Sequence, residues 1–168
     1  MNICLFQMTR PLMRQFFQEF TYDPDTIDGE KPQEQYIYSQ EKADAFFEKH
    51  DQPDQLHFAV MCGEEIVGSL YLKQISLSDR SCSMSIHMKN DSVKDRGYGT
   101  QAEQLALTYA FEKLQLETVY ANALIKNARS RHVLEKVGFK EIRRNGHYSY
   151  YACSRADWQS ISLPGASV

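Results

Sequence analysis

Apolar positions in the first 50 residues predict a short strand followed by two helices. Residues 3–8 form a compact apolar run, which is typical of a strand. Thr9 and Pro11 provide a typical helix start with Thr9 as the N-cap, and the apolar residues that follow recur at near-helical spacing: Leu12, Met13, Phe16, Phe17 and Phe20. Residues 21–33 are rich in Asp, Pro and Gly and predict a loop, after which Ser39 caps a second helix.

Three apolar runs in the middle of the chain predict an antiparallel meander. Residues 56–62 and 65–75 flank a turn that contains Gly63. Residues 82–88 follow a second, polar turn and complete the set of three strands. Residues 99–115 then carry apolar side chains at near-helical spacing and predict a helix.

The last third of the chain predicts a strand, a helix and a hairpin. Residues 118–125 form the strand, and the helix opens at Asn127 and ends at Gly138, a typical C-terminal stop. Asn145 and the glycine after it separate two further strand-like runs, and this dipeptide is the strongest short-range hairpin signal. The order of elements predicts a mixed α/β fold. Without an internal repeat or linker, we expect one domain over residues 1–168.

Composition narrows the classes of partner. The 168 residues, 42% hydrophobic and 24% charged, suit one globular domain with a proper core. A net charge of -3 disfavours nucleic-acid binding through many phosphate contacts. Residues 1–60 hold 11 acidic and 5 basic side chains, whereas residues 61–168 hold 11 and 14. The first part would therefore attract a cation and the second an anion.

The cysteines and the N-terminus point to a cytoplasmic protein without a metal. The four cysteines lie far apart, with no CxxC pair and no histidine at zinc-ligand spacing, so we expect reduced core thiols. No apolar stretch approaches the roughly 18 residues of a membrane span. The N-terminus also lacks a basic leader followed by an apolar run, so we expect neither secretion nor membrane insertion.

A glycine-containing segment lies where a predicted strand gives way to a helix, and it is a candidate anion site. Free backbone N–H groups and the positive end of the helix would converge there on a pyrophosphate, and a plain turn before a surface helix is the alternative. Neither GxxxxGK[ST] nor a complete dinucleotide fingerprint is present. The candidate binding residues are Val93, Lys94, Asp95, Arg96, Gly97, Tyr98, Gly99 and Thr100.

Two sequence blocks resemble the GNAT acetyltransferases. Residues 94–111, KDRGYGTQAEQLALTYAF, resemble the signature Q/R-x-x-G-x-G/A and its following helix. Residues 127–139, NARSRHVLEKVGF, resemble the second half of that fold and look closest to the branch of ribosomal-protein-alanine N-acetyltransferases. Together the blocks cover about residues 83–140. The resemblance implies a GNAT acyl-CoA N-acyltransferase fold, with a central, mostly antiparallel sheet, a splayed parallel strand pair and flanking helices.

The resemblance also implies where acetyl-CoA binds. The coenzyme would lie between strands 82–88 and 118–125, with its pyrophosphate on the loop. The acetyl carbonyl would accept a backbone N–H near His87 or Met88, which would stabilise the oxyanion during attack. Lys94 stands where the family usually has Arg or Gln. Since that contact is made largely through backbone, we expect coenzyme binding to persist.

The start of the last helix supplies a candidate proton donor. Many family members have a tyrosine where Leu134 stands, and the resemblance gives that phenol the task of protonating the departing thiolate. We therefore predict that Ser130 takes this role and that Asn127 helps to bind the coenzyme. The alternative is that Asn127 only caps the helix and Ser130 is an exposed hydroxyl. Arg129 and Arg131 are candidates for the coenzyme phosphate, or belong to a solvated helix face.

The expected reaction moves an acetyl group from acetyl-CoA directly to a primary amine in a ternary complex. His87 is the candidate general base, although a lone histidine on a strand is often a structural hydrogen-bonding group. No covalent acyl-enzyme is expected, since no cysteine has a nearby histidine in sequence. A non-catalytic acyl-CoA-binding sensor or interaction module is the rival interpretation.

The sequence does not identify the acceptor amine. The candidates include a polyamine, an aminoglycoside and a peptide N-terminus. An outward face of the aromatic hairpin is a candidate wall of its pocket. Monomer and homodimer are both compatible with the sequence. Acidic residues of the first loop would draw in a cationic amine or simply keep the loop solvated, namely Asp23, Asp25, Asp28, Glu30 and Glu34.

Overall fold

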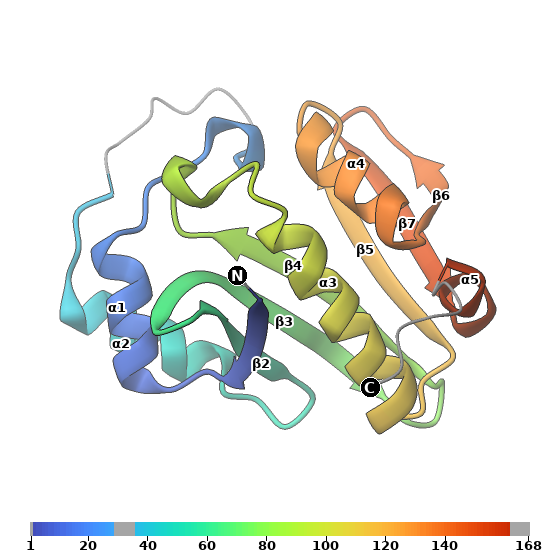
Figure 1. The fold of residues 1–168 in the computed structure, drawn as a ribbon, viewed down its shortest axis with the longest axis horizontal. Helices are drawn as coiled ribbons and strands as arrows, with labels where there is room; N and C mark the ends of the chain where they lie inside the picture. The colour runs from blue at the N-terminus through green and yellow to red at the C-terminus, as the bar shows by residue number, and fades with distance from the viewer. Residues whose placement is uncertain (1, 29–35, 162–168) are drawn as a thin grey trace.

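The computed structural model describes residues 2–28 and 36–161, which form a seven-stranded mixed sheet with flanking helices (Figure 1). The sheet has the order β1-β2-β3-β4-β5-β7-β6. Its strands are β1 (Ile3–Gln7), β2 (Leu56–Cys62), β3 (Glu65–Ser76), β4 (Ser81–Met88), β5 (Thr118–Leu124), β6 (Lys140–Arg144) and β7 (Tyr148–Ser154). The helices are α1 (Arg10–Gln18), α2 (Gln40–His50), α3 (Tyr98–Thr108), α4 (Ala128–Val137) and α5 (Arg155–Ile161). The predicted order of strands and helices is confirmed, with α5 added at the end.

The one parallel pair, β4 and β5, separates along its length. The two strands are in register only from Ser81 opposite Thr118 to Ser83 opposite Tyr120. Beyond that point β5 continues to pair with β7, whereas β4 pairs only with β3. Figure 1 shows β4 and β5 diverging toward their C-terminal ends. The predicted splayed pair is therefore present, and it leaves a gap in the middle of the sheet.

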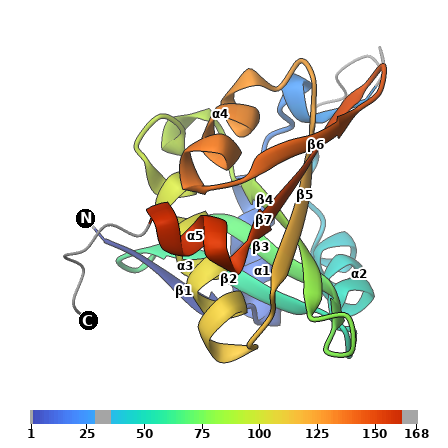
Figure 2. The ribbon, with the colours of Figure 1, turned by 90° about the vertical axis from the view of Figure 1, so that its right-hand side faces the viewer.

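Helices cover both faces of the sheet because its central strands are apolar on both sides. Along β2, Phe58 and Val60 pack in the core that includes α3, whereas Ala59 and Met61 pack against α1 and α2. This division follows the alternation of side chains along a strand. Figure 2 shows α3 and α2 on opposite sides of the sheet.

Three local features differ from the sequence-based expectations. Ser154 caps the unpredicted helix α5, with its Oγ accepting the N–H of Asp157 at 3.0 Å. The helix predicted to reach residue 115 instead ends in a short π-helical segment, η3 (Tyr109–Lys113). The β6–β7 hairpin forms as predicted, but neither Asn145 nor the glycine after it has a positive φ. The Asn145 side chain instead accepts the N–H groups of His147 and Tyr148, which closes the turn.

The cysteines and the helices bear on two further expectations. Cys62, Cys82 and Cys153 are buried in the core as predicted, whereas Cys4 on the edge strand β1 is exposed. In the part of the chain that the structure describes, no helix has the length and apolar character needed to cross a bilayer.

Candidate functional site

A cleft of about 420 Å³ opens where β4 and β5 diverge, between the start of α3 and the start of α4. Arg96 is exposed and is not among the residues that line this cleft. The structure brings together in its wall all the other predicted site residues: His87, Met88, Val93, Lys94, Asp95, Gly97, Tyr98, Gly99, Thr100, Asn127 and Ser130. Residues from three separate parts of the sequence therefore meet in one cavity.

The start of α3 provides backbone donors for an anion. Gly97 is the N-cap, and its φ of 76° lies in the left-handed region that favours glycine. No side chain of residues 2–28 or 36–161 caps this helix end, and the first bond within the helix runs from the N–H of Gln101 to the carbonyl of Gly97. A Cβ placed on Gly99 would meet no atom within 4 Å, so the space beside it is open. The uncapped N–H groups and the helix dipole together suit a phosphate group.

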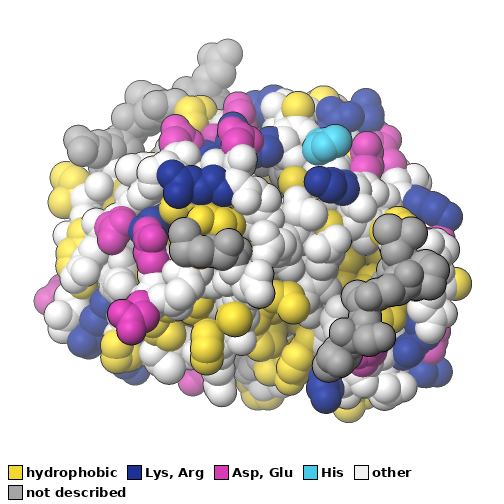
Figure 3. Space-filling model, viewed as in Figure 1, with side chains coloured by type: hydrophobic (Ala, Val, Ile, Leu, Met, Phe, Trp, Pro, Cys, Tyr) yellow, Lys and Arg dark blue, Asp and Glu magenta, His cyan; other side chains and the backbone are white. Residues whose placement is uncertain are grey.

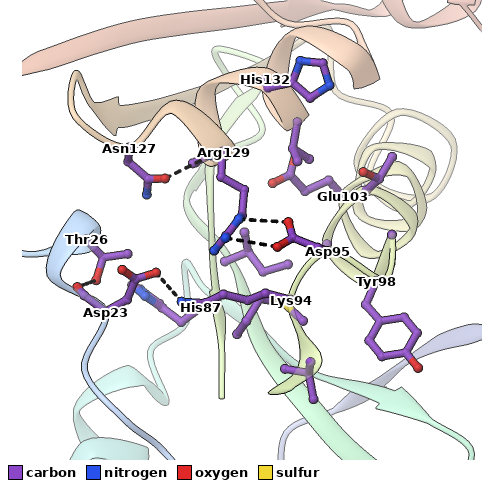
Figure 4. Close-up of a pocket in the computed structure, with 18 of the residues that line it drawn as sticks. Asp23, Thr26, His87, Lys94, Asp95, Tyr98, Glu103, Asn127, Arg129 and His132 are labelled. Atoms are coloured by element: carbon purple, nitrogen blue, oxygen red, sulfur yellow. Dashed lines mark hydrogen bonds and ion pairs between the residues drawn. The ribbon is translucent and has the colours of Figure 1, made fainter. Parts of the chain in front are cut away.

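Lys94 carries a charge that neighbouring carboxylates already compensate. Its Nζ lies 2.5 Å from Asp23 Oδ2 and 2.6 Å from Asp91 Oδ1. Burial alone would lower the pKa of Lys94, but the hydrogen bonds to these two carboxylates outweigh burial and raise it. Figure 4 shows the Asp23–Lys94 pair at the edge of the pocket. Backbone groups at the start of α3, more than this ammonium, thus remain available to an incoming anion.

A second ion pair spans the cleft. Arg129 on α4 reaches Asp95 on the loop before α3, with Nε 3.1 Å from Oδ1 and Nη2 3.2 Å from Oδ2 (Figure 4). Arg131 instead donates to the backbone carbonyl of Ile125 at 3.0 Å. In Figure 3 basic side chains on the upper part of the visible face have acidic side chains beside them. A phosphate that enters here therefore competes with Asp95 for the guanidinium of Arg129.

The structure at the start of α4 distinguishes the position of Asn127 from that of Ser130. Asn127 Oδ1 accepts the N–H of Ser130 at 3.0 Å, so Asn127 caps the helix. The half-buried Ser130 side chain lines the cleft. Leu134, which occupies the position of the usual family tyrosine, is buried in the core. Ser130 is thus a hydroxyl on the α4 side of the cleft, in position to face a ligand.

His87 lies at the end of β4 and lines both this cleft and a second pocket. His87 is exposed where its side chain opens to the cleft. The walls of the two pockets still desolvate the ring in part, which lowers the pKa of His87 below its ordinary value, and the charges of Lys73 and His50 lower it further. The imidazole is therefore neutral near pH 7 and has a nitrogen free to accept a proton.

The second pocket, with a volume of about 270 Å³, is aromatic. The sequence analysis identified Phe16, Phe17 and Phe20 only as apolar residues at near-helical spacing, and no linear signal shows that they border a cavity. The aromatic hairpin, whose outward face was a candidate wall of the acceptor site, contributes no residue to the described lining of either pocket. The described residues that line the second pocket are Phe16, Phe17, Phe20, Tyr22, Tyr36, Lys42, Phe46, Ser69, Tyr71 and His87. Phe20 and His87 belong to both walls, so the two cavities meet at these residues.

Glu103 is a further cleft residue that the sequence analysis missed. It lies one turn beyond Gly99 on α3, is only 2% exposed, and its Oε2 has no hydrogen-bond partner among the described residues. Burial raises the pKa of this carboxyl to about 8. Glu103 is therefore mostly protonated at neutral pH and adds a buried neutral acid to the α3 wall. A glutamate among apolar helix positions is the only sequence signal for it.

Comparisons with known proteins agree with this architecture. A family model described as the acetyltransferase (GNAT) domain matches residues 3–140. The Bacillus subtilis (strain 168) protein named "Probable N-acetyltransferase YjcK" is 24% identical over 146 residues, which is 79% of this chain and 76% of that protein.

Solved structures of Vibrio cholerae spermidine N-acetyltransferase share the fold. The complex with CoA and spermine gives a TM-score of 0.74 at 18% identity, over 94% of this chain and 98% of that one. A dodecameric structure in an intermediate state gives 0.74 at 20% identity, over 96% and 99%. Because the family model spans most of the sequence and the observed fold agrees with it, this chain belongs to the GNAT acetyltransferase family.

Proposed function

We propose that the protein, acting as a single domain, transfers the acetyl group of acetyl-CoA to a primary amine. The observation that carries the proposal is the position of His87, where a cleft with an uncapped helix N-terminus meets a second pocket. The first cavity suits the phosphates and thioester of a coenzyme, and the second suits an acceptor. The alternative of a non-catalytic coenzyme-binding module does not explain why a neutral imidazole stands between the two.

In this proposal His87 accepts the proton that the attacking amine must lose. The amine nitrogen forms a bond to the acetyl carbon and gives one tetrahedral intermediate, which collapses as the bond from that carbon to sulfur breaks. Ser130, on the α4 side of the cleft, donates a proton to the departing thiolate, directly or through a water molecule, and is reprotonated from solvent. The neutral state of His87 supports the first role, and the accessible hydroxyl of Ser130 supports the second.

Coenzyme binding rests on the segment from Val93 to Thr100. The N–H groups at the start of α3 and the open space beside Gly99 favour a pyrophosphate. Asn127 contributes by fixing the start of α4, and the backbone near Met88 at the end of β4 remains the proposed partner of the acetyl carbonyl. Closeness to the ribosomal-protein-alanine branch stays a prediction from sequence.

Acetyl-CoA is expected to stabilise the protein and to release CoA only when an amine is added. At 100 times its dissociation constant, a ligand that binds the folded state alone adds about 2.7 kcal/mol to the free energy of unfolding. Thermal denaturation with and without acetyl-CoA measures this, and a thiol-release assay with primary amines follows in the same preparation. CoA itself is the matched control for binding without transfer. Binding without release by any amine would contradict the proposed transfer.

Replacement of Ser130 by alanine is expected to lower kcat by about tenfold to a hundredfold and to leave acetyl-CoA affinity nearly unchanged. This loss lies at or below the lower end of the range for positioned proton transfer, because a thiolate is a comparatively good leaving group and needs less help from an acid. Ser78→Ala, in the exposed turn before β4, is the matched control. Unchanged turnover in Ser130→Ala would remove this hydroxyl from the mechanism.

A further inference from the structure

The pocket beside His87 has a preformed aromatic wall. Phe17 stands at its centre, with its ring centroid 5.1 Å from that of Phe46, 5.4 Å from that of Tyr36 and 5.6 Å from that of Phe20. Most of these rings meet edge to face, an arrangement that favours firm packing. The helices α1 and α2, with Phe20 after α1 and Tyr36 before α2, therefore present a firmly packed apolar surface beside His87.

Charge in this pocket disfavours an acceptor with several positive charges. None of the described residues that line it is Asp or Glu, and the one lysine or arginine among them is Lys42. Two described carboxylates close in sequence to the pocket residues Phe20 and Tyr22 are engaged elsewhere: Glu19 pairs with Lys89, and Asp23 pairs with Lys94. Asp28 lies 3.4 Å from His147 on the hairpin.

The acidic loop predicted to attract a cation therefore does not face this pocket where it is described. Asp23 is turned toward Lys94 and Asp28 toward His147, and Asp25 is exposed and lines neither cavity. Glu30 and Glu34 lie outside the described residues. A second ammonium group on an acceptor would enter an apolar pocket beside Lys42 without a described counter-charge, and would lose solvation there.

We propose that the acceptor is a primary amine attached to an apolar group of roughly aromatic-ring size, which fills this pocket while the amine lies at His87. An apolar cavity of about 150 Å³ is enough to hold benzene, so a pocket of about 270 Å³ has room for a ring and a short linker. The shared walls at Phe20 and His87 connect such a group to the coenzyme cleft. The inference rests on the proposed function and names the substrate class of the same site.

Three amines test the proposal with the full-length protein and acetyl-CoA. The probe 2-phenylethylamine carries the ring, ethylamine lacks it, and spermidine replaces it with further positive charges. We expect kcat/KM for 2-phenylethylamine to exceed the values for the other two by about 10- to 100-fold, the effect of burying one aromatic side-chain equivalent.

Two variants test whether the aromatic pocket is responsible for the preference among the three amines. Phe46→Ala removes part of the wall without touching the coenzyme cleft, so it is expected to lower kcat/KM for 2-phenylethylamine about tenfold relative to the value for ethylamine. Lys42→Glu is expected to raise the use of spermidine relative to 2-phenylethylamine. Because Lys42 is exposed and lies three residues after the N-cap Ser39, glutamate there completes a capping box and keeps the helix stable.

A binding measurement separates this inference from the proposed function. The CoA-loaded protein has no acetyl group to transfer, and calorimetry with the same three amines reports pocket preference alone. Stronger binding of 2-phenylethylamine without turnover of any amine would reject acetyl transfer and keep the pocket assignment. Turnover with spermidine equal to or above 2-phenylethylamine, unaffected by Phe46→Ala, would overturn the acceptor class and leave acetyl transfer standing.

Discussion

The variant His87→Asn is expected to lower kcat by about 10²- to 10⁴-fold, the usual contribution of one positioned proton-transfer group. Asparagine keeps a polar side chain at the junction of the two cavities but has no basic nitrogen. Acetyl-CoA affinity is expected to change little, because the backbone groups at the start of α3 stay intact. Steady-state kinetics with saturating acetyl-CoA measures the loss, and thermal denaturation with the coenzyme measures binding.

The pH profile distinguishes a base from a structural histidine. Because the pKa of His87 is lowered, the active neutral form persists below the ordinary histidine range. We expect kcat/KM of the unmodified protein to fall only as the pH drops through that lowered pKa, and this acidic limb to disappear in His87→Asn.

His132→Asn is the matched control for His87→Asn, because His132 lines the same cleft from α4 without bordering the aromatic pocket. It is expected to keep the turnover and pH profile of the unmodified protein. A His87→Asn variant with full turnover and an unchanged acidic limb would exclude His87 as the base.

The variant Glu103→Gln is expected to remove a large pH dependence of stability. The pKa of this carboxyl is about 8 in the folded protein against 4.5 as its ordinary value. Between these values the unfolded chain releases a proton that the folded protein retains. The free energy of unfolding therefore falls as pH rises, by at most about 1.4 kcal/mol per pH unit. Below pH 4.5 both states are protonated, and above pH 8 the full penalty is reached.

Chemical denaturation of the coenzyme-free protein at pH 5.5 and pH 8 tests this expectation. Glu103→Gln should be more stable than the unmodified protein at pH 8 and should lose the decline between the two pH values. Glu112→Gln, an exposed residue of η3, is the matched control and should retain the decline. Equal slopes in all three proteins would show that Glu103 ionises as easily in the folded state as in the unfolded one.

Local sequence signals predicted most of the fold. The strands β1 to β5, the N-caps Thr9 and Ser39, and the stop at Gly138 all depend on residues close together in the chain. Helix α5 was missed even though Ser154 and Asp157 form a short capping pattern, because the apolar period that follows is brief. The hairpin was predicted, but its turn closes through the Asn145 side chain and not through a positive φ.

By itself the sequence determined the order of elements as far as the hairpin, the family and the position of the loop of Val93 to Thr100, since each is encoded in contiguous residues. Only the tertiary structure decided which charged groups near that loop pair with one another and which aromatic side chains form a pocket. It pairs Lys94 with Asp23, 71 positions away, and it assembles the aromatic pocket from α1, α2, β3 and β4. It also buries Glu103, whose Oε2 has no hydrogen-bond partner in the part of the chain that the structure describes. The physical reason is that charge compensation, burial and cavity walls depend on which distant side chains packing brings together, and no periodicity along the chain records those contacts.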